Sequence, residues 1–183
     1  FLMIVNQADD PQLNVHDIPG FLRHVLERAD WTRDLHFQTE TTIDTLDYSG
    51  GALNVGSKVV IAAAGPRRFD LASELPGFIR LPEHFRNPRV VLPRAVAIEG
   101  PACDSPVLPM TSQTEYAKKL WRSNHITRFC ESYHRDDLIA RFRWIVIVDD
   151  SSFVADSLRN FLWVTFTRAN PSADIHGIEP FVH

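Results

Sequence analysis

Residues 145–176 read IVIVDDSSFVADSLRNFLWVTFTRANPSADIH, and this stretch decides the fold. Its first four residues form a continuous apolar run, which is typical of a strand buried on both faces of a parallel sheet. Asp156 or Ser157 can cap the following helix, whose apolar residues recur at helical spacing. The helix should end at Asn170, because the residue before a proline is pushed out of the α region. The stretch therefore predicts a strand that leads into a helix.

A second stretch repeats this pattern at a constant offset of 140 residues. Residues 21–36 read FLRHVLERADWTRDLH, and they share six identities with residues 161–176. The identical pairs are Phe21/Phe161, Leu22/Leu162, Arg28/Arg168, Ala29/Ala169, Asp34/Asp174 and His36/His176. An apolar run, Leu2–Asn6, precedes the first copy, and Asp17 is its matching helix cap. We therefore expect an internal repeat with units at about 1–64 and 143–183.

The rest of the chain adds strands, turns and one more helical region. Residues 57–64, 89–92 and 95–98 read as strands, and residues 66–109 hold eight of the twelve prolines. Such a stretch should form short extended pieces that wrap the sheet. Residues 113–142 follow a helical pattern, with candidate core positions at Tyr116, Leu120, Phe129, Tyr133, Leu138 and Phe142. The sequence predicts one α/β domain over residues 1–183, with a layered, mostly parallel sheet, flanking helices and two related strand–helix units.

Length and composition exclude several classes of protein. The chain has 183 residues and a formal net charge of −4, so it lacks the basic excess of a nucleic-acid binder. No apolar run approaches the length of a membrane-spanning helix. Two cysteines give no disulfide framework, and a reducing cytoplasm is the expected compartment. The first residue is not a methionine and the last residues form no tail, so we expect a piece of a longer protein.

A glycine-rich segment resembles a phosphate-binding loop but fails on residue order. Residues 51–58 read GALNVGSK, whereas a phosphate loop needs lysine followed by serine or threonine. Exchanging these two residues misplaces both the phosphate-binding amine and the magnesium-binding hydroxyl. The eight histidines show no close metal-ligand spacing. Cys130 and His134 lie one helical turn apart, and a buried cysteine beside a surface histidine explains them better than a thiol–imidazole pair.

The VDD segment at residues 148–150 resembles the start of a bacterial receiver domain. An acidic pair at the carboxyl end of a parallel strand lies where sites form in α/β proteins. A receiver also needs a later phosphoacceptor and a lysine, and the 33 residues after Asp150 contain no lysine. The chain therefore does not contain an intact receiver domain, and Asp149 and Asp150 can simply cap the strand end. A non-catalytic, receiver-like interaction or signalling module stays open as an alternative function.

Several segments taken together resemble a known family. They are the IDTLDY run at residues 43–48, the NVGSKVVI run at 54–61, the VDD end of the strand at 146–150, and the run FLW…TR…P…D at 161–174. This ordered set resembles the C-terminal domain of the UbiD-like decarboxylases, in particular the longer members in which the C-terminal unit occurs twice. One departure is clear: after GSK and an isoleucine the family continues Asp-Ala-Thr, and this chain reads Ala62-Ala63-Ala64. The first copy is therefore expected to be a structural relic.

The resemblance implies a function that is carried mostly by another part of the polypeptide. The family's enzymes remove or add a carboxyl group on aromatic or α,β-unsaturated acids with prenylated flavin mononucleotide (FMN). The catalytic Glu-Arg-Glu set and the metal ions that hold the flavin phosphate belong to a separate N-terminal flavin-binding domain. This chain is thus expected to contain no catalytic, cofactor-binding or metal-binding residues and to be inactive alone. It should pack against that domain and support a homo-oligomer.

Four residues are the candidates for contact with a substrate pocket or a neighbouring subunit. Asp44, Asp47, Ser57 and Lys58 would order the loop that faces it. Ordinary turn chemistry explains the same residues as backbone-capping groups and a solvated amine. Arg168 and Asp174 occur in both copies and are expected to fix the helix to its exit loop.

Overall fold

The structure is a computed structural model, and it describes residues 1–42, 56–70, 72–101 and 125–180. Six strands and four labelled α-helices are described, with two short 3-10 turns and a helical stretch at residues 125–131. In chain order the labelled elements are β1 (Leu2–Val5), η1 (Gln7–Asp9), α1 (Ile18–Arg28), β2 (Leu35–Thr41), β3 (Gly56–Ala63), β4 (Arg86–Leu92), β5 (Ala95–Glu99), η2 (Leu138–Arg141), β6 (Trp144–Val148), α3 (Ser151–Asp156), α4 (Leu158–Thr167) and α5 (Pro171–Asp174).

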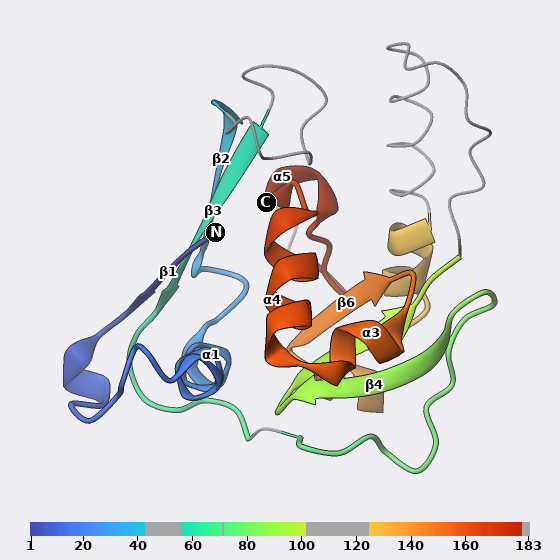
Figure 1. The fold of residues 1–183 in the computed structure, drawn as a ribbon, viewed down its shortest axis with the longest axis horizontal. Coiled ribbons are helices and arrows are strands. Elements are labelled where there is room, and N and C mark those ends of the chain that lie inside the picture. The colour runs from blue at the N-terminus through green and yellow to red at the C-terminus, as the bar shows by residue number, and fades with distance from the viewer. Residues whose placement is uncertain (43–55, 71, 102–124, 181–183) are drawn as a thin grey trace.

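The strands form two separate three-stranded sheets (Figure 1). Sheet A has the order β1-β3-β2, in which β1 is parallel and β2 antiparallel to β3. Sheet B has the order β4-β5-β6, in which β6 is parallel and β4 antiparallel to β5. The predicted α/β class is confirmed, and each sheet is mixed. Both sheets thus contain one strand that leads into a helix and one antiparallel pair.

The two sheets enclose a layer of helices (Figure 1). On the sheet A side, Val25 of α1 and Ala29, the residue that caps its end, pack against Val59 and Ile61 of β3. On the sheet B side, Phe161 of α4 packs in a second cluster with residues of β5, β6, α1 and α3: Leu22, Ala95, Ala97, Val148 and Val154. The helical layer therefore joins both sheets into one body.

Strand β5 shows how side-chain size sets the layers, because all five of its residues are buried. Ala95 and Ala97 face the α4 side, where their small side chains let the helix come close. Val96 and Ile98 face the opposite side, where Phe129 and Phe142 pack against them. A residue run that is apolar on both faces is what a central strand requires.

The two strand–helix units share their local hydrogen bonds at the offset of 140 residues. Asp17 caps α1 by accepting from the Gly20 backbone N–H, and Ser157 caps α4 by accepting from the Asn160 N–H. After each helix, an aspartate closes a turn on a backbone N–H four residues earlier. Asp34 accepts from the Asp30 N–H at 2.8 Å, and Asp174 accepts from the Asn170 N–H at 2.6 Å. Asp174 thus closes the turn that follows α4, while the predicted role of Arg168 and Asp174 in fixing the helix itself stays a prediction.

Some expectations about individual elements were wrong or incomplete. Strand β2 lies in a polar run that the sequence did not assign to a strand, because it is mostly exposed at a sheet edge. Helix α3 precedes α4 as a separate short helix that Asp150 caps. Leu138 is 43% exposed rather than in the core, because it begins η2 beside an open pocket. Tyr116 and Leu120 lie outside the described residues.

Candidate functional site

The predicted loop site is only partly described, and its described part joins β3 to the segment around α5. Asp44 and Asp47 lie outside the described residues. Ser57, near the start of β3, donates its hydroxyl to the Asn170 side chain and accepts from the Ser172 backbone N–H at 2.9 Å. Ser57 therefore connects sheet A to α5 of the second unit.

Lys58, the neighbour of Ser57, points to solvent. Its Nζ atom donates to the Thr42 backbone oxygen at 3.3 Å, and the residue is exposed. The structure thus separates these two neighbours, because successive side chains of a strand point to opposite faces.

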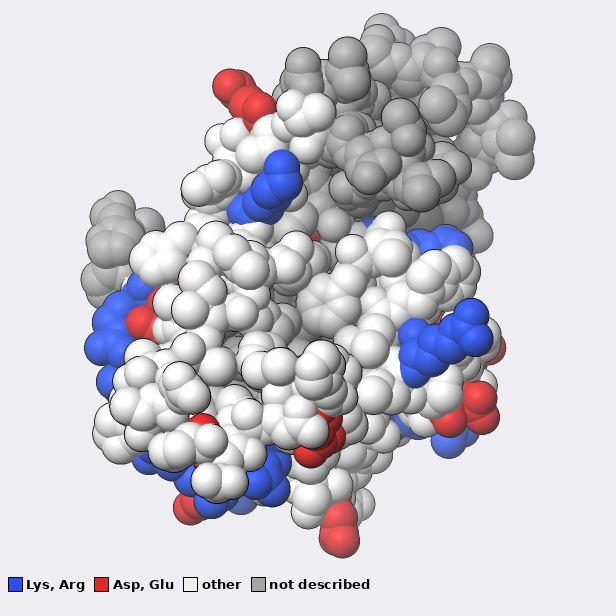
Figure 2. Space-filling view, turned by 60° about the vertical axis from the view of Figure 1, so that its left-hand side comes forward, with Lys and Arg blue, Asp and Glu red and all other residues white. Residues whose placement is uncertain are grey.

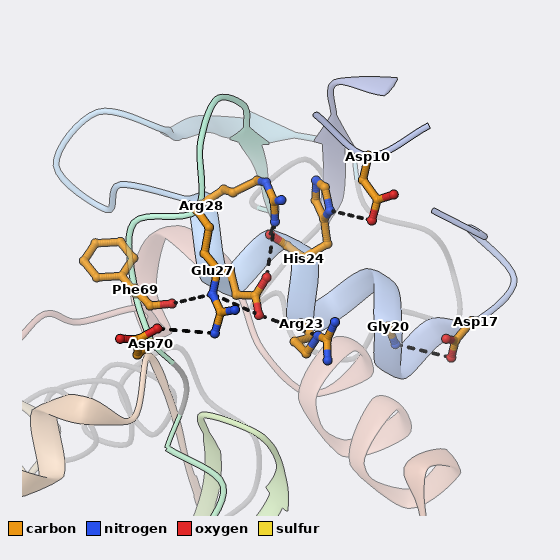
Figure 3. Close-up of polar contacts among 10 residues, drawn as sticks. Asp10, Asp17, Gly20, Arg23, His24, Glu27, Arg28, Phe69 and Asp70 are labelled. Carbon is orange, nitrogen blue, oxygen red and sulfur yellow. Dashed lines mark hydrogen bonds and ion pairs between the residues drawn. The ribbon is translucent and has the colours of Figure 1, made fainter. Parts of the chain in front are cut away.

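A buried carboxylate on α1 is the centre of an arginine cluster (Figure 3). Glu27 is 6% exposed, and its carboxylate lies 3.6 Å from Arg23 Nε, 3.3 Å from Arg28 and 3.6 Å from Arg67 Nε. Its backbone oxygen accepts from the N–H groups of Arg68 and Phe69. A buried carboxylate is expensive unless it is paired in this way. Glu27 thereby holds the chain at residues 67–69 against α1.

His24 lies on the same helix, one turn before Arg28, and is 3% exposed. Its Nδ1 atom is 3.9 Å from the carboxylate of Asp10, while its Nε2 atom is buried without a hydrogen-bond partner (Figure 3). Burial, followed by the charge of Arg28, lowers the pKa of His24. The imidazole is therefore neutral at neutral pH.

Arg143 enters the junction between the units from the residue before β6. Its terminal nitrogen donates to the Ala29 backbone oxygen at 2.5 Å, at the end of α1. Its guanidinium carbon lies 3.7 Å from the centre of the Phe69 ring and 4.9 Å from the Trp31 ring. Burial lowers the pKa of Arg143 to about 10. This cation–π contact contributes on the order of 1–2 kcal/mol when it is desolvated.

A polar network lies where the parallel strands β5 and β6 end. Glu99, the last residue of β5, accepts from Arg86 Nε at 3.0 Å and from the Asn87 side chain at 2.8 Å. The Ser151 hydroxyl, which is fully buried, lies 3.2 Å from Glu99 and donates to the Asn87 backbone oxygen at 2.6 Å. The hydrogen bond from the Asn87 side chain holds the pKa of Glu99 low.

In the neighbouring VDD segment, Asp150 caps the helix α3. One carboxylate oxygen of Asp150 accepts from the backbone N–H groups of Ser152 and Phe153 and from the Ser152 hydroxyl at 2.6 Å. The hydrogen bond from that hydroxyl lowers the pKa of Asp150. This oxygen is thus engaged as a helix cap rather than presented as a phosphoacceptor.

Cys130 and His134 have separate surroundings. Burial raises the pKa of the Cys130 thiol to about 11, so the thiol is protonated at neutral pH. The ring of His134 instead lies 2.7 Å from Glu179, which also accepts from Arg135 Nε at 2.7 Å. The prediction that these two residues form no thiol–imidazole pair agrees with this geometry.

An open pocket of about 530 Å³ lies between the chain at residues 78–82 and the helical region at 132–139. Phe78, Tyr133 and Leu138 are among the residues that line it. The Tyr133 hydroxyl donates to the Arg80 backbone oxygen at 2.7 Å, and burial raises its pKa to about 12. The phenol is therefore neutral and already engaged, so it is poorly suited to acid–base work.

Sequence reasoning missed the groups that form these networks. Glu27 and Glu99 are charged residues next to apolar ones, and that placement was the available signal for a buried, paired carboxylate. Their partners come from distant segments, so no local motif identifies them. Among residues 1–42, 56–70, 72–101 and 125–180, no group of three His, Cys, Asp or Glu side chains could hold a metal ion. In that same part of the chain, no helix is both long and apolar enough to cross a membrane.

Comparison with known proteins matches part of the chain to one family model and most of it to proteins of Chlamydia. Residues 1–63 match the family model of the 3-octaprenyl-4-hydroxybenzoate carboxy-lyase C-terminal domain. An uncharacterized protein of Chlamydia trachomatis serovar D is 30% identical over 177 residues, which are 96% of this chain and 25% of that protein. A Chlamydia pneumoniae protein, named as a subunit of 4-hydroxybenzoate decarboxylase, is 28% identical over 178 residues, or 97% of this chain and 26% of that protein.

The chain thus spans about a quarter of the length of the curated relatives it matches. No solved structure matches it. The family model covers the first strand–helix unit as far as the end of β3, and the relatives extend the similarity over nearly the whole chain. Residues 1–63 therefore match a UbiD-like C-terminal domain, and a relative named as a decarboxylase subunit supports the resemblance that the sequence motifs predicted.

Proposed function

We propose that this chain is the C-terminal packing and oligomerisation domain of a UbiD-like carboxy-lyase. The complete enzyme would remove or add a carboxyl group on aromatic or α,β-unsaturated acids, with prenylated FMN as cofactor. The relative named as a 4-hydroxybenzoate decarboxylase subunit supports an aromatic acid as substrate. We place the enzyme in the cytoplasm, as a homo-oligomer whose flavin-binding domain is the partner of this chain.

The observation that carries this proposal is the outer face of sheet A. Leu2 and Ile4 of β1 point away from the helical layer and are 55% and 49% exposed. In the sheet register they lie beside Val60 and Ala62 of β3, so the apolar residues form one continuous strip. Figure 2 views the molecule from this side and shows a largely uncharged middle with Lys, Arg, Asp and Glu side chains around it. An exposed apolar strip with a charged rim is typical of a protein–protein contact.

The described residues do not fit a flavin site. A metal-held flavin phosphate needs several oxygen or nitrogen ligands that converge on one ion. The absence of a three-residue ligand group from the described part of the chain leaves no such set there. The main buried carboxylates, Glu27 and Glu99, already accept from arginines within the fold. We therefore assign flavin binding and decarboxylation to another part of the polypeptide.

The test compares the complete polypeptide with a double variant of the outer face. Leu2→Glu/Ile4→Glu should reduce CO₂ release from 4-hydroxybenzoate or cinnamate and weaken subunit association, measured by analytical ultracentrifugation. The matched control is Val15→Glu, because Val15 is 54% exposed but lies outside the sheet. Activity and assembly that equal the wild type in the double variant would contradict the packing role. Stoichiometric flavin absorbance in the isolated 183-residue chain would contradict the assignment of the cofactor.

A further inference from the structure

Two arginines lie side by side where sheet B begins. In the parallel pair of β5 and β6, Ala95 lies opposite Trp144, and the Trp144 N–H donates to the Arg94 backbone oxygen at 3.0 Å. Arg94 and Arg143 therefore occupy neighbouring positions just before the two strands. Adjacent strands are about 4.8 Å apart, so the two residues share one corner of the sheet.

Within the described part of the chain, neither arginine has a carboxylate in ion-pair contact. Arg94 is 8% exposed, and the Nε atoms of Arg94 and Arg143 are both buried without a hydrogen-bond partner. Among the described residues, no Asp or Glu oxygen lies within 4.0 Å of either guanidinium. Buried charges in proteins are normally paired, because an unpaired one costs several kcal/mol. Among the described residues, this corner therefore has no carboxylate in direct contact with either guanidinium.

The acidic side chains that face the corner are already paired with other arginines. Glu27 pairs with three arginines of the cluster described above, and Asp70 lies 3.4 Å from Arg67. Asp30 lies 3.7 Å from Arg68. The adjoining Arg33 pairs with Asp34, and six other arginines lie near these three carboxylates: Arg23, Arg28, Arg67, Arg68, Arg94 and Arg143. The surplus positive charge falls on Arg94 and Arg143.

The backbone does not explain why residue 94 is an arginine. Its φ of 66° lies in the left-handed region, in the two-residue turn between β4 and β5. Glycine adopts this conformation without the steric cost of a side chain, and a turn with proline before it usually has glycine or asparagine here. Arg94 thus combines a strained backbone with an unpaired, buried charge. Residues with a strained backbone cluster at functional sites.

We propose that the Arg94–Arg143 corner binds a small oxyanion, which is a phosphate or a carboxylate. The planar arginine fork donates two parallel N–H bonds to such a group. Arg143 is already oriented by the Ala29 oxygen and the Phe69 ring, so its free Nε can donate with little loss of freedom. The bound anion would neutralise both guanidinium groups and join α1 to the start of sheet B. This proposal is independent of the decarboxylase assignment.

The experiment uses the complete polypeptide in a low-salt buffer at constant ionic strength. Sodium phosphate and sodium acetate are each added in place of sodium chloride, and Tm is measured by differential scanning calorimetry. One of them should raise Tm with saturation, and the one that saturates identifies the oxyanion as phosphate or carboxylate. No saturable rise with either probe overturns the proposal.

The decisive variant is Arg94→Met, which keeps the aliphatic stem and removes the charge. Without the probe, it should be at least as stable as the wild type, because an unpaired buried charge is gone. With the probe, its affinity should fall by roughly tenfold or more, since charge-assisted hydrogen bonds are lost. Arg159→Gln is the control, because Arg159 is exposed on α4 and its variant should bind the probe as the wild type does.

Two outcomes would show that Arg94 is only structural. One is that Arg94→Met has a lower Tm than the wild type by the same amount in chloride as in the probe. The other is unchanged probe affinity in Arg94→Met. If that variant does not fold, Arg94→Lys keeps the charge and loses the fork, and isothermal titration calorimetry should then show weaker binding. Equal affinity of the lysine variant would equally overturn the proposal.

Discussion

Replacing Phe161 with alanine tests the helical layer that joins the two sheets. Phe161 is 0% exposed and packs with residues of β5, β6, α1 and α3. Its ring lies edge-on to Trp144, with centroids 5.9 Å apart. The repeat offers a matched control, because Phe21 has the equivalent place on α1 but is only partly buried, against the sheet A cluster.

The expected loss of stability in each variant follows from how deeply its phenylalanine is buried. Removing a fully buried phenyl ring costs about 3–5 kcal/mol, because the transfer free energy is lost and a cavity remains. For a chain of this size, such a loss lowers Tm by about 6–20 °C. Phe21→Ala should cost roughly half as much, since the cost scales with the apolar area removed from water.

The assay is urea unfolding of the 183-residue chain and both variants, followed by tryptophan fluorescence. The midpoint should fall further for Phe161→Ala than for Phe21→Ala, with unchanged slopes. Trp144 lies against Phe161, so its emission should also shift in the folded Phe161→Ala protein. Equal losses in the two variants would refute the view that Phe161 lies at the centre of the body and Phe21 at its margin.

Three further predictions address single contacts. Ser57→Ala removes the hydrogen bonds to Asn170 and to the Ser172 N–H, and should lower the free energy of unfolding by about 1 kcal/mol in urea titrations; an unchanged midpoint would show that the two units do not depend on this contact. The hydrogen bond to Glu179 raises the pKa of His134, so the stabilisation is complete below the ordinary histidine value of 6.5 and is lost as the pH rises through the raised pKa. The pKa of Glu179 is lowered to about 2, so its stabilisation is lost only as the pH falls toward that value. Glu179→Gln should lower the pKa of His134 in an NMR titration, and an unmoved titration would contradict the contact. In a Cys103→Ser background, Cys130 should react with a thiol reagent at pH 8 much more slowly in the folded than in the urea-unfolded chain, because burial raises its pKa to about 11; equal rates would show that the thiol is accessible.

Local chemistry made much of the secondary structure predictable. The predicted strands at 57–64, 89–92 and 95–98 correspond to β3, β4 and β5, within a few residues. Asp17 and Ser157 cap helices at the offset that the repeat requires. These features depend on neighbours in the sequence, through apolar periodicity and side chains that satisfy nearby backbone N–H groups. Strand β2 was not predicted in this way, because its apolar alternation is short: only Leu35 and Phe37 are apolar, and the rest of the strand is polar.

In the candidate site too, the sequence identifies single residues, and only the fold supplies their partners. The sequence identified Ser57 as a residue of interest, but its partners Asn170 and Ser172 lie more than a hundred positions away. The predicted pocket or subunit role of Ser57 and Lys58 stays a prediction, as does that of Asp44 and Asp47, which lie outside the described residues. The arginine corner is a further example, because Arg94 and Arg143 become neighbours only through the pairing of β5 with β6.

By itself, the sequence determined the α/β class, the two strand–helix units and the family relationship, because each depends on short patterns that fold or align locally. Tertiary structure alone decided that the strands divide into two mixed sheets around a helical layer. It also decided which charged residues are buried, and which of them find a partner. The physical reason is that burial and electrostatic pairing depend on distances between segments that are far apart in the chain.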